Sequence, residues 1–186
     1  FGDDNGTPSC EPGGYRYRLY IPLNRSGCTV TVILKNPSGC DGEGCDRTTR
    51  NVLKYLLGAD PFPQPVGLVV TVNLYAYQET DASALASLIR NYPAKQWEGT
   101  YNDQFIQAAA AQSDFVILAW GNPITGATRE YRQRITSLWR QLDHRNVFCK
   151  GVTMRGFPRH LGGWRGQVAD LQTVSAIDDR GTIKIV

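Results

Sequence analysis

Three asparagines stand at the ends of apolar, strand-like runs in this sequence. They are Asn36, Asn73 and Asn122, at the ends of residues 30–34, 67–74 and 115–120. A carboxamide is not a strong base, but it can hold a water molecule, and its donor and acceptor together can contact a pyrimidine edge. Ligands of open α/β sheets bind at the carboxyl ends of the strands. An Asn before Pro37 is also a common turn dipeptide, so this motif by itself favours a simple turn.

A basic and aromatic segment near the C-terminus contains His160. A histidine can donate a hydrogen bond to a leaving group in a dry site. Arginines bind phosphates, and aromatic rings stack on exposed bases. A solvated surface loop explains the segment about equally well when it is taken alone. The residues of this segment that we expect to contact DNA are Arg155, Arg159, Trp164 and Arg165.

An acidic, Gly-rich loop follows Pro37 directly. Glu43 or Asp46 could hold a second water or contact the amino group of a base, and a solvated loop with a helix cap is the alternative. Cys40 and Cys45 lie in the same loop, but a Cys-x4-Cys spacing without a second close pair is a poor metal signature. We therefore expect no metal ion and no redox cofactor.

The pattern of apolar residues predicts alternating strands and helices. Strands are expected at residues 15–22, 30–34, 66–74, 115–120, 146–149 and 181–186. Helices are expected at 49–57, after a cap at Asp81, at 101–112 and at 125–142. This alternation predicts a single, doubly wound α/β domain, with a mostly parallel central sheet flanked by helices. Residues 1–14 are expected to be a flexible lead, and residues 15–186 the domain.

Composition sets broad limits on location and partners. The 186 residues contain 20 Lys and Arg against 17 Asp and Glu, which gives 20 − 17 = +3. Such a charge permits nucleic-acid binding without arguing for it. Five cysteines are an odd number without the spacing of a secreted scaffold, so we expect a reducing, cytoplasmic setting. No run is long enough for a membrane span. We expect a monomer without an obligate protein partner.

Taken in order, four motifs resemble the uracil-DNA glycosylase superfamily, and more closely a bacterial and phage branch known only by a domain-of-unknown-function label. The resemblance covers about residues 15–166. The motifs are Leu34-Lys-Asn-Pro-Ser-Gly39, Val72-Asn73-Leu74, Trp120-Gly121-Asn122 and Arg159-His160-Leu161. The first motif lacks its opening Gly, and no Pro follows His160. The resemblance implies a uracil-DNA glycosylase-like fold.

Each motif carries a role in that superfamily. The resemblance implies that Asn36 positions the attacking water, that Asn73 reads the pyrimidine edge and that His160 contacts the base carbonyl. It also implies that the loop after His160 wedges into DNA, through Leu161 or Trp164. The expected activity is that of a monofunctional DNA N-glycosylase, which flips out a base and leaves an abasic site.

The residues after Pro37 bear on the substrate. Where the uracil-specific branch has a bulky Tyr, this chain has small residues, Ser38, Gly39 and Cys40. We therefore expect a 5-substituted pyrimidine, such as hydroxymethylated or glucosylated cytosine in phage DNA, and a role in anti-phage defence. Two alternatives remain open from the sequence. One is an N-glycosidase of free modified nucleosides or nucleotides, and the other is a non-catalytic module that binds modified DNA.

Overall fold

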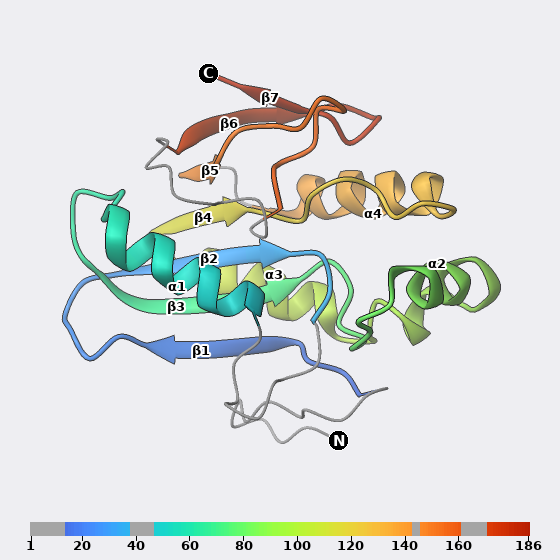
Figure 1. Ribbon diagram of the computed structural model, residues 1–186, viewed down its shortest axis with the longest axis horizontal. Helices are drawn as coiled ribbons and strands as arrows, with labels where there is room; N and C mark the ends of the chain where they lie inside the picture. Colours follow the sequence, from blue (N-terminus) through green and yellow to red (C-terminus); the bar gives the residue numbers. More distant parts are fainter. Residues whose placement is uncertain (1–13, 38–46, 143–145, 161–170) are drawn as a thin grey trace.

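The computed structural model describes residues 14–37, 47–142, 146–160 and 171–186. Within these ranges the chain forms a seven-stranded sheet of order β1-β3-β2-β4-β5-β6-β7 with helices on both faces (Figure 1). The strands are β1 (Arg18–Pro22), β2 (Cys28–Leu34), β3 (Val66–Asn73), β4 (Phe115–Leu118), β5 (Val147–Cys149), β6 (Gln172–Ile177) and β7 (Ile183–Ile185). The helices are α1 (Arg47–Ala59), α2 (Ala82–Asn91), α3 (Asn102–Ala111) and α4 (Thr128–Gln141), with a 3-10 turn η1 (Ala94–Gln96).

The centre of the sheet is parallel and its two sides are antiparallel. β3, β2, β4 and β5 run in one direction. β1 pairs antiparallel with β3, and β6 and β7 add antiparallel strands beyond β5. The α/β class is therefore confirmed, but the sheet is mixed rather than mostly parallel. Hydrophobic alternation along a strand reports which side chains are buried and does not report strand direction, so the antiparallel sides were not foreseeable from it.

Alternating side chains of the central strands build a core on each face of the sheet. On one face α1 packs Val52 and Leu56 against β2 residues such as Val32. On the other face α2, α3 and α4 pack against the residues of opposite parity, among them Ile33. Helices on both faces make the domain doubly wound, as the sequence predicts. Burying one such aliphatic side chain contributes roughly 1.5–3 kcal/mol.

Most predicted elements are present, with bounds that differ by a few residues. The cap predicted at Asp81 is confirmed, because its carboxylate accepts from Ser83 N at 2.7 Å at the start of α2. The sequence does not predict β6, because Val174 is its one fully buried side chain and its hydrophobic signal is weak. The expected lead at residues 1–14 lies almost wholly outside the described residues. No helix in the described ranges combines the length and hydrophobicity that a membrane crossing requires.

Candidate active site at the carboxyl edge of the sheet

The order of the parallel strands creates a switch point between β2 and β4. From β2 the chain passes through α1 to β3 on one side, and from β4 it passes through α4 to β5 on the other. Ligands of open α/β sheets bind where the connections diverge in this way. Leu34 pairs with Asn73, and Ile33 pairs with Leu118. The three predicted strand ends therefore meet at one edge, as expected.

Asn36 is half-buried just beyond β2, and backbone carbonyls orient its amide. Nδ2 donates to Glu79 O at 2.5 Å and to Pro37 O at 3.3 Å. Pro37 O also accepts from Glu79 N at 3.3 Å, which ties the turn after β2 to the segment after β3. Because Nδ2 is the donor to these carbonyls, Oδ1 of Asn36 is the acceptor that can hold a water molecule.

His160 packs directly on the turn after β4, although the two segments are far apart in the sequence. Gly121 has a φ of 74°, and a Cβ at this position would lie 2.8 Å from the Cβ of His160. Tyr131 of α4 holds the same turn from inside, because its hydroxyl is shared between Trp120 O at 3.0 Å and Gly121 O at 3.1 Å. Glycine is thus required at 121 both by the backbone angle and by the approach of His160.

The segment that carries His160 is a loop closed by its own hydrogen bonds. Arg159 N donates to Gly151 O at 3.0 Å. The hydroxyl of Thr153 donates to Asn122 Oδ1 at 2.7 Å, which docks the loop on the turn after β4. His160 itself is exposed. The loop therefore seats His160 on the turn after β4.

Met154 and Arg155 form the exposed tip of this loop. Gly156 N donates to Thr153 O at 2.9 Å and closes the turn beneath them. The relative exposure of Met154 is 107%, so its whole side chain stands in water. No sequence pattern marks Met154, since one Met in a loop forms no motif. An exposed apolar side chain on a closed turn is suited to inserting between stacked groups.

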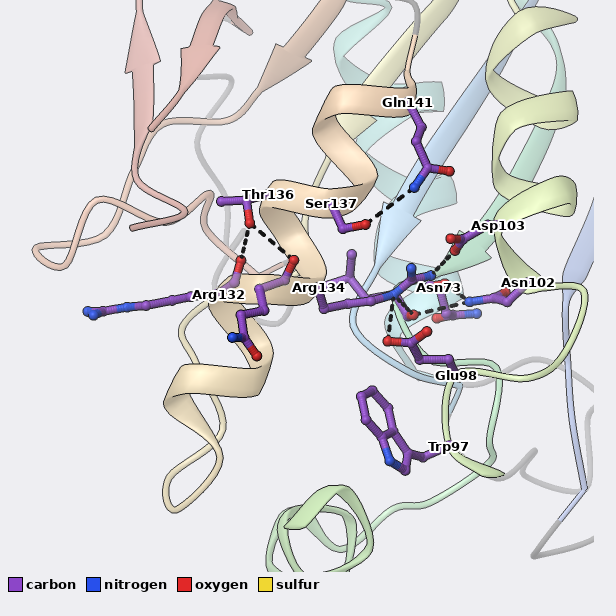
Figure 2. A network of polar contacts seen from close by, with 12 residues as sticks. Asn73, Trp97, Glu98, Asn102, Asp103, Arg132, Arg134, Thr136, Ser137 and Gln141 are labelled. Atoms are coloured by element: carbon purple, nitrogen blue, oxygen red, sulfur yellow. Dashed lines mark hydrogen bonds and ion pairs between the residues drawn. The ribbon is translucent and has the colours of Figure 1, made fainter. Parts of the chain in front are cut away.

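A buried polar network holds the chain where it leaves β3, and Figure 2 shows its side chains converging from α3 and α4. Asn102 Nδ2 donates to Asn73 O at 2.9 Å and to Leu74 O at 3.1 Å. Arg134 Nε donates to Leu74 O at 2.8 Å, and its Nη2 lies 2.5 Å from Asp103 Oδ1. The backbone on either side of the end of β3 is therefore fixed by side chains of two helices.

Glu98 completes this network, with Oε1 at 3.7 Å from Arg134 Nε (Figure 2). Burial raises the pKa of the Glu98 carboxyl, and the positive charge of Arg134 opposes the rise. Arg134 is 4% exposed, so its charge is met by Glu98 and Asp103 rather than by solvent. We assign these groups a structural role, since they hold the carbonyls after β3.

Three polar atoms beside the edge are buried without a hydrogen-bond partner among the described residues. They are Asn73 Oδ1, Tyr75 Oη and Trp120 Nε1. Native proteins pair nearly all such atoms with protein or water, and an unpaired one costs about 1–3 kcal/mol. Asn73, the predicted pyrimidine reader, is 1% exposed, so a base must enter the edge to contact it. All three side chains are at most 1% exposed, so these atoms face the protein interior.

Lys35 is a residue of this edge that sequence reasoning missed. It is half-buried between β2 and Asn36, and its Nζ lies 5.6 Å from the centre of the Tyr131 ring. Burial lowers the pKa of its amine from 10.5 to about 8. A signal existed in the sequence, because Lys35 is the charged residue that interrupts the apolar run just before the Asn-Pro motif. One lysine at the end of a strand is nonetheless too common to be informative by itself.

The other predicted site residues divide into two groups. Arg155 and Arg159 are exposed on the loop that carries His160, as a role in DNA binding requires, and Arg159 Nε donates to Val152 O at 3.2 Å. The remaining predicted residues, which lie outside the described ranges, are Glu43, Asp46, Leu161, Trp164 and Arg165. Cys40 and Cys45 also lie outside them.

The chain belongs to the family described as Protein of unknown function (DUF1643), whose pattern matches residues 16–160. The matched region begins before β1 and ends at His160, so it includes every strand end of the candidate site. No curated protein and no solved structure matches the chain. The family description names no activity, and the resemblance to uracil-DNA glycosylases stays a prediction.

Proposed function

We propose that this DUF1643 protein is a DNA glycosylase that hydrolyses the N-glycosidic bond of a modified pyrimidine. The observation that carries the proposal is the packing of His160 on Gly121, at the switch point to which β2 delivers Asn36. Four motifs that are separate in the sequence thereby surround one edge. The same convergence supports a uracil-DNA glycosylase-like version of the doubly wound fold.

The two residues divide the chemistry between the departing base and the attacking water. Cleavage of an N-glycosidic bond builds positive charge on the sugar and negative charge on the base. His160 donates to the departing base from a fixed position, so little reorganisation is needed as charge develops. Asn36 holds the water through Oδ1, while its Nδ2 is anchored to Glu79 O. A strong base is unnecessary when bond breaking runs ahead of water attack.

Extraction of the base from duplex DNA is assigned to the loop that carries His160. Arg155 and Arg159 contact phosphates from exposed positions. Met154 at the tip fills the gap left by the flipped nucleotide and offsets part of the unstacking cost, which is a few kcal/mol. In this proposal the extruded base meets Asn73 at the end of β3, whose Oδ1 is an unpaired acceptor among the described residues. Leu161 and Trp164, the wedge residues that the sequence predicts, lie outside the described residues.

The proposed substrate class rests on the sequence, which has the small residues Ser38, Gly39 and Cys40 where the uracil-specific branch has a bulky Tyr. We propose hydroxymethylated or glucosylated cytosine in phage DNA, and hence a defence role in the cytoplasm. Glu43 and Asp46 are assigned to the hydroxyl groups of that substituent. Neither a metal ion nor a redox cofactor has a part in the proposed reaction.

The test compares hypermodified phage DNA, uracil-containing DNA, unmodified DNA and the free modified nucleoside, with released bases identified by mass spectrometry. Release from the modified DNA is expected, and Asn36→Ala and His160→Ala should each lose roughly 10²-fold or more. Asn91→Ala, an exposed amide of α2, and His144→Ala, the second histidine, serve as controls. Wild-type rates in both site variants contradict the assignment. Release from the free nucleoside alone favours a nucleoside hydrolase, and binding without release favours a recognition module.

A further inference from the structure

Lys35 places a primary amine at the same edge as the two proposed catalytic residues. Its backbone is fixed, because Tyr75 N donates to Lys35 O at 3.0 Å. Its Nζ lies 5.6 Å from the centre of the ring of Tyr131. The hydroxyl of that tyrosine holds the carbonyl of Gly121, on which His160 packs. The ring of Tyr131 therefore lies beside the amine, and its hydroxyl bonds to the turn on which His160 packs.

The environment of this amine favours its neutral, nucleophilic form. Burial is the cause that lowers the pKa of Lys35 to about 8, and no described carboxylate pairs with its Nζ. At pH 7 roughly one molecule in ten then carries a neutral amine, against about one in three thousand for an ordinary lysine. Lysines desolvated in this way are the ones that attack carbonyl carbons.

We propose that Lys35 is a carbonyl-reactive amine that forms an imine with the C1′ aldehyde of an abasic site in DNA. This inference rests on the proposed function for the origin of the abasic site, because hydrolysis at the sheet edge that holds Asn36 would generate that aldehyde at the edge to which Lys35 also belongs. The chain would then process the product of its own first reaction, a step that the sequence, which predicts a monofunctional enzyme, did not suggest.

The chemistry balances without an oxidant or a reductant. The Nζ lone pair adds to C1′ and the C1′ oxygen is protonated to give the carbinolamine. The carbinolamine then takes up one proton from solvent and loses one water, which gives the protonated imine. A water molecule takes a proton from C2′, the electron pair of that C–H bond forms the C2′–C3′ double bond, and the C3′–O bond breaks with the 3′ phosphate as leaving group. Water then hydrolyses the imine, which restores the Lys35 amine and leaves an unsaturated aldehyde on the cleaved strand.

The experiment supplies the abasic site ready-made, so that it does not depend on base release by this protein. A duplex with one abasic site is incubated with the whole chain and sodium cyanoborohydride, which reduces an imine to a stable amine. A covalent protein–DNA adduct is expected, with the DNA remnant on Lys35 in peptide mass spectra. Lys35→Met and Lys35→Arg should lose the adduct, and Lys54→Met, at an exposed lysine of α1, should keep it.

Each outcome bears on the proposal. Lys35→Arg retains a positive charge but cannot form this imine under these conditions, so an adduct that survives in it, or that maps to another lysine, overturns the inference. Absence of any adduct with the wild-type chain overturns it as well. An adduct at Lys35 without base release from modified DNA would leave the inference standing and refute the proposed glycosylase. Base release from modified DNA without an adduct would refute this inference and leave the proposed glycosylase standing.

Discussion

Replacing Lys35 by Met should stabilise the protein at neutral pH, because the substitution removes a buried charge and keeps an unbranched apolar stem. The pKa of Lys35 falls from 10.5 to about 8 in the folded chain, a difference of about 2.5 units, and each unit corresponds to about 1.36 kcal/mol. The charged form therefore opposes folding by at most about 3 kcal/mol. Since the side chain is half-buried, solvent screens part of this cost, and we expect a gain of about 1–3 kcal/mol in the free energy of unfolding.

The pH dependence of this gain has a defined sign. Below pH 8 both folded and unfolded wild-type chains carry the proton, so the cost is present in full. Between about pH 8 and 10.5 the unfolded chain keeps the proton and the folded chain loses it, and wild-type stability rises relative to the variant. The advantage of Lys35→Met should therefore be largest at pH 7 and shrink steadily toward pH 10.

Urea unfolding of both proteins at pH 7, 8, 9 and 10 measures this difference. The buried tyrosines and cysteines with raised pKa values, such as Tyr75 and Cys149, are common to both chains and cancel to first order in the comparison. Lys54→Met, at an exposed position, should change stability by less than about 0.5 kcal/mol. The reasoning is refuted if Lys35→Met is less stable than wild type at pH 7, or if the difference between them does not vary with pH.

Two further predictions concern the turn and loop that present His160. Gly121→Ala should abolish most base release and also lower the free energy of unfolding by about 1–2 kcal/mol, because the new Cβ meets His160 at 2.8 Å and φ is 74°. Base-release assays and urea unfolding test this. Full activity in the variant would contradict the packing of His160 on Gly121. Met154→Ala should slow base release from duplex DNA and leave base release from single-stranded DNA unchanged, since no side chain has to fill a gap in a single strand. Equal slowing on both substrates would exclude this role for Met154.

The sequence was sufficient to locate the strand ends at which the candidate site lies. Apolar runs terminated by Pro37 and Gly121 identify buried strands and their exits, because neither residue continues a regular ladder easily. A parallel arrangement then requires the exits to share an edge, and the pairing of Leu34 with Asn73 confirms it. These signals are local in the sequence. They predict the strands correctly because the core strands are buried on both faces and so read as continuous apolar runs.

The direction of the outer strands was not determined by such signals. β1 and β6 carry short, weakly alternating patterns that fit either direction. β1 pairs with β3 although β2 follows it in the chain, and this choice depends on which edge of the sheet is left open after β2 and β3 pair. The pairing partner of β1 therefore depends on the other strands of the sheet and not on the sequence of β1 alone.

Only the tertiary structure decided which polar groups at the edge lose their solvation through burial. Lys35 in the sequence is an ordinary lysine, and its lowered pKa arises because elements distant in the chain, including Tyr131 of α4, cover it. The unpaired states of Asn73 Oδ1 and Trp120 Nε1 likewise depend on neighbours from other elements. Desolvation is a property of everything packed around a group, so residue order along the chain does not reveal it.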